Sequence, residues 1–258
     1  SKSSKESPAV MLDQMRLSVN SLNGSLGLAQ AQLTTLLADK TFPFAIGPIR
    51  AFGRKALSEL FATRDMLSYA ESLLLLYPRI AGFIEPKTYL VLLQNSAELR
   101  PTGGFIGSIG KLTFDGGMLS DFVIQDVYAV DGQLKGHVDP TVPIRELLSQ
   151  EHWYLRDSNW DPDFFASGQQ AAWFYEKETG ETVDGVIALA LPLVVDILRV
   201  TGPVVLSDYN DQITADNFFG KSIYYTKDKF FPGSTQKSDF LGTLARTLLL
   251  RLTTDTHI

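Results

Sequence analysis

The chain has 258 residues, of which 45% are hydrophobic and 20% charged, and its formal net charge is -6. This composition suits a globular protein with a sizeable core, and the acidic balance argues against a nucleic-acid partner, because phosphate neutralisation requires a basic surface. The absence of cysteine excludes disulfides, thiolate metal sites and cysteine nucleophiles. The motifs H-E-x-x-H and G-x-S-x-G, typical of zinc proteases and serine hydrolases, do not occur.

Two helical segments are predicted before residue 87. Apolar residues recur at helical spacing over residues 9–39, with an interruption expected near Asn23-Gly24, and again over residues 49–76. Proline and glycine between residues 42 and 48 separate the segments, and residues 78–86 close the region. The pattern predicts an N-terminal helical hairpin over residues 1–86. Its polar side is not strongly basic, so we assign the apolar stripe to protein core rather than to a membrane surface.

Residues 87–258 are predicted to form an α/β domain with a central mixed sheet flanked by helices, the hairpin being packed on it; α+β is the alternative. Apolar runs predict buried strands at residues 89–93 and 183–191, and strands at 105–114 and 118–128 flank a glycine turn. A polar loop is expected at 127–139 and helices at 141–149, 164–178, 192–200 and 238–253. The remaining expectations are an edge strand at 204–206, a helical turn at 214–219 and a mobile loop at 221–238.

Polar residues gather directly after the first buried strand, where ligands usually bind in an open α/β sheet. Arg100 offers a planar fork of donors that suits phosphate or carboxylate, and two glycines permit positive φ or a close backbone approach. We therefore predict an anion site here; the alternative is a surface turn in which Arg100 pairs with Glu98. The substrate-binding residues predicted in this segment are Asn95, Glu98, Thr102, Gly103 and Gly104.

A second polar concentration, WYLRDSNWDPDFF, occupies residues 153–165. Its aromatic side chains can stack on sugar rings, and Asn159 and Trp160 are predicted to bind substrate. The same residues also predict a loop that enters a helix, with Asp161 as N-cap and Pro162 at the first helical position. We expect Arg156 of this loop and Arg100 to converge above one edge of the sheet into a shared positive pocket.

Three stretches resemble a bacterial family known only as domain of unknown function 4012. They are LVLLQNSAELRPTGGFIGSIG, DVYAVDGQL and WYLRDSNWDPDFFASGQQAAWFYEKETGETVDGVIALALPLVVDILRVTGPV, which lie within residues 87–206. Members of that family typically carry an N-terminal membrane helix and face the outside of the cell. The resemblance implies an extracytoplasmic cell-envelope protein, anchored in the membrane by a segment upstream of this sequence.

A more remote resemblance is to the LytR-CpsA-Psr transferases, which move glycopolymers from a polyprenyl-phosphate carrier to the cell wall with magnesium. Arg100 and Thr102 are similar to that family's Arg-Thr-Asp turn, and Asp126 is similar to the aspartate of its Pro-Arg-Asp motif. Gly103 and Gln125 depart from it, because they stand where a metal-binding aspartate and a second arginine are expected. The resemblance implies a phosphotransferase that acts on polyprenyl-phosphate-linked glycopolymers.

Two hypotheses follow. In the first, Arg100 and Arg156 clamp the phosphate and Asp126 joins them in catalysis, because phosphoryl transfer needs cationic clamps and a bridging metal. The carboxylates predicted to bind Mg²⁺ are Asp126, Asp131, Asp157 and Asp161. In the second, a non-catalytic surface module binds envelope glycan, a lipid carrier or a protein partner through its tryptophans and arginines. An apolar tunnel beside Arg100 would favour the transferase, because a polyprenyl tail needs one.

Overall fold

The computed structural model describes residues 7–39, 47–227 and 236–254. The chain divides into two compact units, the first formed by Ser1–Pro86 with Phe114–Met118 and the second by Lys87–Thr113 with Leu119–Ile258. In the described ranges, no helix combines the length and the apolar character that a membrane crossing requires.

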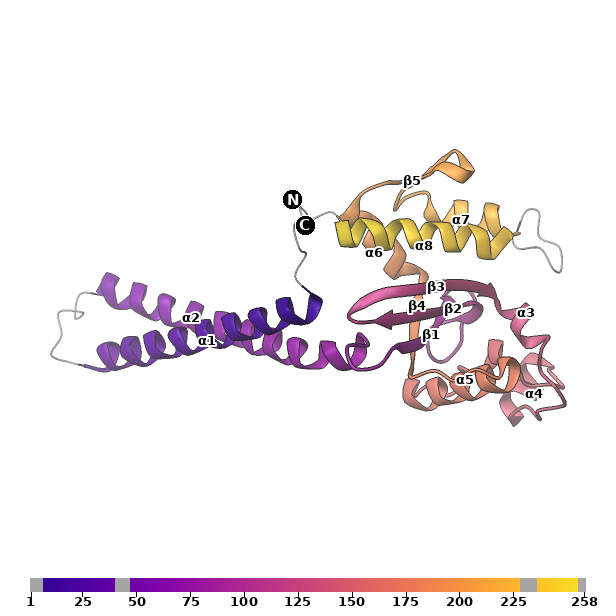
Figure 1. The fold of residues 1–258 in the computed structure, drawn as a ribbon, viewed down its shortest axis with the longest axis horizontal. Helices are drawn as coiled ribbons and strands as arrows, with labels where there is room; N and C mark the ends of the chain where they lie inside the picture. Colours follow the sequence, from indigo (N-terminus) through magenta and orange to yellow (C-terminus); the bar gives the residue numbers. More distant parts are fainter. Residues whose placement is uncertain (1–6, 40–46, 228–235, 255–258) are drawn as a thin grey trace. The chain divides into compact units, whose positions relative to one another are not determined.

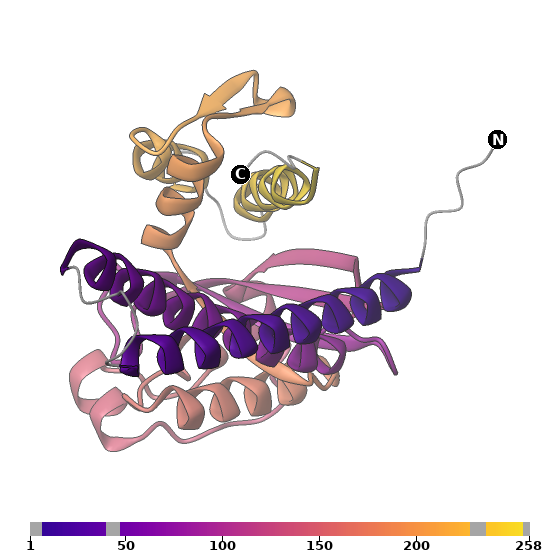
Figure 2. The ribbon, with the colours of Figure 1, turned by 90° about the vertical axis from the view of Figure 1, so that its left-hand side faces the viewer.

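The first unit is a pair of long helices that lie side by side, as Figures 1 and 2 show: α1 (Pro8–Ala38) and α2 (Gly47–Ile80). Ser7 caps α1 by accepting a hydrogen bond from the Val10 amide, and Pro8 takes the first helical position. The interruption expected near Asn23-Gly24 is wrong, because a single glycine costs a helix only about 1 kcal/mol.

The contact between α1 and α2 has the spacing of a coiled coil. Positions on α2 that are buried or half-buried recur every three or four residues and include Arg50, Gly53, Leu57, Leu60, Arg64, Leu67, Glu71 and Leu74. Gly53 allows close approach, because a Cβ there would lie 2.8 Å from the Leu37 side chain. Arg64 donates hydrogen bonds across the contact to Asn23 and Gln30, at 3.0 and 2.7 Å.

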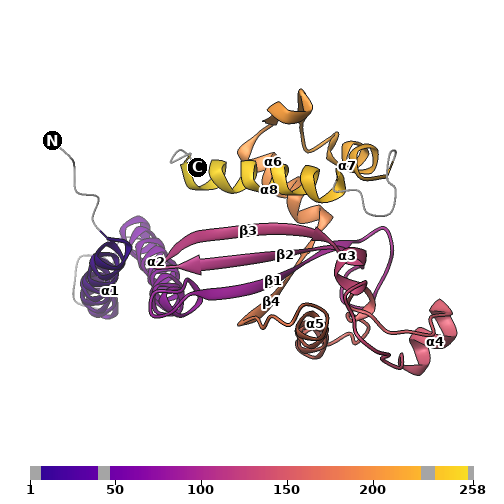
Figure 3. The same ribbon diagram turned by 45° about the vertical axis from the view of Figure 1, so that its right-hand side comes forward.

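The mixed sheet of the second unit contains β1 (Lys87–Asn95), β2 (Phe105–Asp115), β3 (Met118–Asp126) and β4 (Gly185–Ala190) in the order β3-β2-β1-β4 (Figure 3). The strands β1 and β4 are parallel, with Tyr89 opposite Gly185 and Leu93 opposite Leu189. A two-residue turn joins β2 to β3, which only antiparallel neighbours permit. The predicted mixed sheet with flanking helices, preceded by two long helices, is therefore confirmed; the packing of the hairpin on the sheet stays a prediction.

Helices flank the sheet on opposite faces, as Figures 1 and 3 show: α5 (Phe164–Thr179) packs against β4, and α6 (Leu191–Thr201) contacts β1 and β4. The long connection from β3 to α5 contains α3 (Val127–Asp131), α4 (Val142–Leu148) and a short 3-10 helix, η2 (Leu155–Asp157). The core of this region consists of Leu90, Leu92, Ile106, Ile109, Val127, Val130, Leu155, Ala171, Phe174 and Tyr175. These buried apolar residues join β1 and β2 to α3, η2 and α5.

The C-terminal part has a core of its own. It contains β5 (Val204–Leu206), η3 (Ser207–Tyr209), β6 (Asp211–Ile213), α7 (Phe218–Lys227) and α8 (Gln236–Thr254). Its buried residues are Leu198, Val204, Leu206, Ile213, Phe218, Phe240, Leu244 and Leu248. The mobile loop predicted over residues 221–238 is wrong at both ends, because residues 221–227 belong to α7 and residues 236–238 belong to α8. Residues 228–235 lie outside the described residues.

Candidate functional site

The two polar segments predicted from the sequence meet in a buried group of two arginines and two aspartates, here named the arginine–aspartate cluster: Arg100, Asp131, Arg156 and Asp157. One oxygen of Asp157 lies 3.2 Å from Arg100 Nη2, and the other lies 3.5 Å from Arg156 Nε. Arg156 Nη1 also donates to Asp131 Oδ2 at 2.7 Å. A single carboxylate, that of Asp157, therefore bridges two guanidinium groups that come from loops 56 residues apart in the chain.

Local structure fixes each member of this cluster. Asp131 is the last residue of α3, and Arg156 and Asp157 lie on η2. The Arg156 guanidinium lies over the Tyr154 ring, 4.3 Å from its centroid, and the Arg100 guanidinium lies 5.3 Å from that of Phe105. A planar cation that lies on the face of an aromatic ring is attracted to it. Tyr154 of the second polar segment therefore holds Arg156, and Phe105 of β2 holds Arg100.

The charges in the cluster balance. The side chains of Asp131 and Asp157 are only 3% and 4% exposed, and those of Arg100 and Arg156 are 14% and 16% exposed. Buried charges are retained in proteins when they are paired and hydrogen-bonded, because desolvation of an unpaired ion is costly. Two positive and two negative groups thus pair with one another, so the four side chains together carry no net positive charge.

Glu178 adds a third carboxyl group beside the cluster. It is buried at the end of α5, and its Oε1 accepts a hydrogen bond from the Leu155 amide at 3.2 Å. Burial, with a contribution from the nearby Asp131 carboxylate, raises the pKa of Glu178 to about 8. Burial also raises the pKa of Asp131 to about 6, although the hydrogen bond from Arg156 opposes this. Glu178 is therefore mostly protonated at neutral pH and adds little negative charge.

The turn after β1 is shaped by its own backbone. A Cβ on Gly104 would lie 2.2 Å from the Asn95 carbonyl oxygen, and Gly103 has a φ of +129° with the Gln94 side chain beside it. The Asn159 side-chain amide donates to the Gly104 carbonyl at 2.8 Å, and Thr102 Oγ1 donates to the Asn159 carbonyl at 3.4 Å. Gly103 and Gly104 thus allow the turn to pack closely against Gln94, Asn95 and Asn159 of the same chain.

The acidic side chains of this turn and of the α5 entrance have local partners. Asn95 Nδ2 donates to Glu98 Oε1 at 3.3 Å, while Arg100 pairs with Asp157, so the surface pairing of Arg100 with Glu98 is wrong. Asp161 Oδ1 accepts from the Asp163 amide at 2.8 Å, and Asp163 caps α5. The assignment of Asp161 as N-cap is therefore also wrong, by two residues.

Two further predicted site residues, Asp126 and Trp160, are not members of the arginine–aspartate cluster. Asp126 caps α3 by accepting a hydrogen bond from the Tyr128 amide at 2.9 Å, and Trp160 is half-buried next to Asn159. Over residues 7–39, 47–227 and 236–254, no three acidic or histidine side chains are grouped so that they could hold a metal ion. The four aspartates do not offer a ready set of ligands, and magnesium stays a prediction of the transferase hypothesis.

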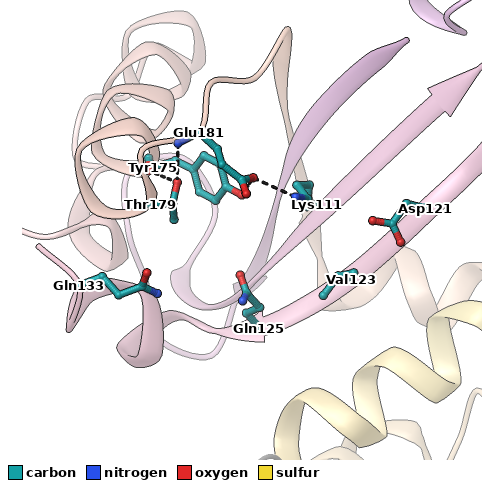
Figure 4. A pocket seen from close by; sticks show the side chains of 8 residues that line it. All are labelled: Lys111, Asp121, Val123, Gln125, Gln133, Tyr175, Thr179 and Glu181. Atoms are coloured by element: carbon teal, nitrogen blue, oxygen red, sulfur yellow. Dashed lines mark hydrogen bonds and ion pairs between the residues drawn. The ribbon is translucent and has the colours of Figure 1, made fainter.

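A separate pocket opens at the edge of the sheet, with a volume of about 220 Å³ (Figure 4). Here named the polar pocket, it is lined by Lys111, Asp121, Val123, Gln125, Gln133, Tyr175, Thr179 and Glu181. Lys111 comes from β2, and three residues at alternate positions of β3 share one face of the sheet. The others come from α5, from the residue after its C-terminal glycine and from the loop after α3.

Hydrogen bonds hold one wall of the polar pocket. Glu181 Oε2 accepts from Lys111 Nζ at 2.9 Å and from the Tyr175 hydroxyl at 3.0 Å, and Figure 4 shows these side chains together. These bonds lower the pKa of Glu181, the one from Lys111 most. Burial and the bond to Glu181 raise the pKa of Tyr175 to about 12. The pocket therefore presents one ammonium, two carboxylates, two amides and two hydroxyls at neutral pH.

Sequence reasoning missed the polar pocket. Gln125 was named only because it stands where the LytR-CpsA-Psr transferases have a second arginine. Lys111, Gln133 and Glu181 were not considered as site residues. The alternating polar residues Asp121 and Gln125 in β3 are a signal of one exposed strand face. That signal cannot reveal the pocket, because Tyr175 and Glu181 reach it from an element more than 40 residues away.

Comparison with models of known families gives a match. Residues 85–221 match the model of the family described as "Protein of unknown function (DUF4012)", which is more than half of the chain. No curated protein matches the chain. No solved structure matches it either.

Proposed function

The chain belongs to the DUF4012 family, whose description assigns no activity, and we propose that it is a non-catalytic cell-envelope module that binds glycan. The ligand is a neutral, polyhydroxylated ring, and the site is the polar pocket. The observation that carries this proposal is the pairing of both candidate phosphate clamps, Arg100 and Arg156, with the buried carboxylate of Asp157.

The pairing argues against an anion as the preferred ligand. A phosphate that entered the arginine–aspartate cluster would meet two carboxylates, and it would have to displace Asp157 from both guanidinium groups. Breaking a buried ion pair typically costs about 3–5 kcal/mol. A preorganised phosphate site instead aims its cations at the place that the ligand occupies. The arginine–aspartate cluster is therefore better suited to stabilising the fold than to binding phosphate.

The polar pocket has the properties that a small sugar requires. Its volume of about 220 Å³ lies below the roughly 300–1,000 Å³ of pockets that hold drug-sized ligands, so one ring is a suitable occupant. Amide, hydroxyl and carboxylate groups offer donors and acceptors for several ligand hydroxyls. The two carboxylates, Asp121 and Glu181, outnumber the single ammonium of Lys111, which disfavours an anionic ligand. Envelope glycan is the source of such rings that the resemblance implies.

Calorimetric titration of the full chain with a neutral N-acetylhexosamine disaccharide tests the proposal. Gln125→Ala and Gln133→Ala each remove a side-chain amide that hydrogen-bonds the sugar in this proposal. Each is expected to weaken binding by up to about tenfold, since one such bond contributes about 1.4 kcal/mol or less. Gln169→Ala, which changes an exposed glutamine of α5 outside the pocket, is the matched control and keeps the wild-type affinity. No measurable sugar binding by the wild type, or equal affinities in all three variants, would overturn the proposal.

The second candidate is a phosphotransferase acting on polyprenyl-phosphate-linked glycopolymers. The observation that favours it is that Arg100 and Arg156 lie close enough together to contact the same carboxylate, that of Asp157. Binding of pyrophosphate or a polyprenyl phosphate that is lost on Arg100→Ala, in a variant with unchanged circular dichroism, would favour this candidate over the glycan-binding module. Magnesium dependence of that binding would strengthen it further.

Location in the envelope is part of the proposal. The resemblance to surface-exposed family members supports an extracytoplasmic domain held by an upstream anchor. Protease protection in whole cells and in spheroplasts tests this: the domain is expected to be digested from outside the membrane. Digestion only after lysis would contradict it.

A further inference from the structure

The helix α2 carries a second apolar stripe, on positions that do not contact α1. Its members recur at alternating intervals of three and four residues: Ala62, Met66, Tyr69, Leu73, Leu76 and Ile80. Met66, Tyr69, Leu73 and Leu76 are 72%, 73%, 65% and 49% exposed. Apolar groups of this size gain free energy when water is removed from them, so their alignment on one exposed side needs an explanation.

The spacing identifies the kind of partner. Intervals of three and four over several turns form the a and d positions of a coiled-coil seam, which accepts the side chains of another helix. The stripe runs from Ala62 to Ile80, about 27 Å along the helix axis. A flat protein surface or a loop would not require this repeat. The partner is therefore expected to be a helix with a similar apolar seam.

We propose that this partner is α2 of a second copy of the chain, lying antiparallel to the first. The stripe is self-complementary about a two-fold axis near Glu71 and Ser72: Met66 faces Leu76 of the second copy, and Tyr69 faces Leu73. Ala62, the smallest member, faces Ile80 at each end. Such reciprocal contacts are the property that a two-fold symmetric interface requires.

The charges beside the stripe select the antiparallel orientation. Asp65 and Arg79 flank the same edge of the stripe, and within the described ranges neither takes part in an ion pair. In the antiparallel pair, Asp65 of each copy lies beside Arg79 of the other, and Ser72 lies beside Ser72. A parallel pair would place Asp65 beside Ala70 and leave its charge without a partner. Flanking charges of this kind set orientation in coiled coils.

A lipid surface is the less suitable occupant. Helices that lie in a membrane interface usually carry many lysines and arginines on their polar side. The positions that flank the stripe are Thr63, Asp65, Ala70, Ser72, Tyr77 and Arg79. They contain one acid and one base, which suits reciprocal pairing and offers no net attraction to anionic lipid.

Site-specific cross-linking of the full chain tests the arrangement without background, because the chain has no cysteine. Ser72→Cys lies at the two-fold axis, so a short bismaleimide is expected to join two copies. Ser58→Cys is the matched control on the same helix; in the antiparallel register its two copies lie roughly 40 Å apart. Cross-linking through Ser58→Cys but not Ser72→Cys would overturn the proposed register.

Sedimentation velocity provides the second readout. Leu73→Glu is expected to abolish the dimer, whereas Leu75→Glu, which changes a 54% exposed leucine outside the stripe, is expected to preserve it. Arg79→Asp alone weakens the dimer, and the combination Asp65→Arg with Arg79→Asp restores it. A monomeric wild type at high micromolar concentration, a Leu73→Glu variant that still dimerises, or a monomer that binds anionic vesicles through the stripe would each overturn the proposal.

Discussion

Asp157 contacts two guanidinium groups with its two carboxylate oxygens, and this single residue determines how the predicted site should be understood. The sequence places Arg100 and Arg156 in polar loops that suit a ligand. It does not show that a buried aspartate next to Arg156 accepts both of them. The same residue types thus describe a phosphate clamp in one arrangement and an internal ion network in the other.

Asp157→Asn is therefore expected to destabilise the protein by about 3–5 kcal/mol, because it leaves buried positive charge without its partner. Urea unfolding followed by circular dichroism measures the change. The matched control is Asp196→Asn, which removes a 65% exposed carboxylate that pairs with Arg199 three residues away; its effect is expected to stay below about 1 kcal/mol. An Asp157→Asn variant that is as stable as the control would show that the network does not support the fold.

Glu178 gives the stability a pH dependence. Its pKa rises from 4.5 to about 8 in the folded chain, so the folded state binds more protons than the unfolded state between these values. Stability is therefore expected to fall as pH rises from about 5 to about 8, because the slope follows the difference in bound protons. Asp131, whose pKa rises from 3.8 to about 6, adds to the fall at the lower end.

Glu178→Gln isolates this contribution, since the neutral amide resembles the protonated carboxyl group. Unfolding midpoints measured across this pH range are expected to decline in the wild type and to be nearly flat in the variant above about pH 6. A wild type whose stability increases between about pH 5 and about pH 8 would contradict the assignment of a protonated Glu178.

The turn between β1 and β2 is the element on which the cluster depends. Gly104→Ala is expected to destabilise the protein by about 3 kcal/mol or more, because its Cβ would lie 2.2 Å from the Asn95 carbonyl oxygen and the backbone would have to move. The same change at Gly168, in α5, places the Cβ in ordinary contact with Val186 at 3.7 Å and Phe164 at 4.0 Å. It also removes a helix glycine, which is expected to stabilise by about 0.5–1 kcal/mol. Thermal unfolding of both variants distinguishes these outcomes, and equal effects would contradict the turn geometry.

Most of the elements were predictable, because their signals are local. The apolar run before Arg100 predicted β1, and the glycine pair at residues 116–117 predicted the β2–β3 hairpin, where both residues have positive φ. The end of β3 was not predicted. Asp126, its last residue, caps α3, whereas residues 127–139 were expected to form a loop. The short strand β6 was missed because its sequence, DQI, lacks the apolar run that predicted the equally short β5, VVL. The pocket and the bridging role of Asp157 depend on contacts between distant segments, which periodicity does not encode.

At the scale of the whole molecule, the polar pocket and the apolar stripe belong to different compact units. Leu73→Glu is therefore expected to leave the affinity for a single sugar unit unchanged. The same change is expected to weaken binding to polymeric glycan by about tenfold or more, because a dimer presents two pockets to one polymer. Surface plasmon resonance with disaccharide and immobilised polymer separates these affinities. Loss of disaccharide binding in this variant would contradict the separation, and Leu75→Glu serves as the control.

The most direct measurement is nuclear magnetic resonance of the isotopically labelled full chain, titrated in parallel with neutral disaccharide and with pyrophosphate. The glycan-binding proposal predicts that disaccharide shifts the resonances of Lys111, Gln125, Gln133 and Glu181, while pyrophosphate leaves the Arg100 and Arg156 Nε–H resonances unchanged. Pyrophosphate shifts at both arginine Nε–H groups, with the polar pocket unaffected by sugar, would contradict the proposal and support the transferase.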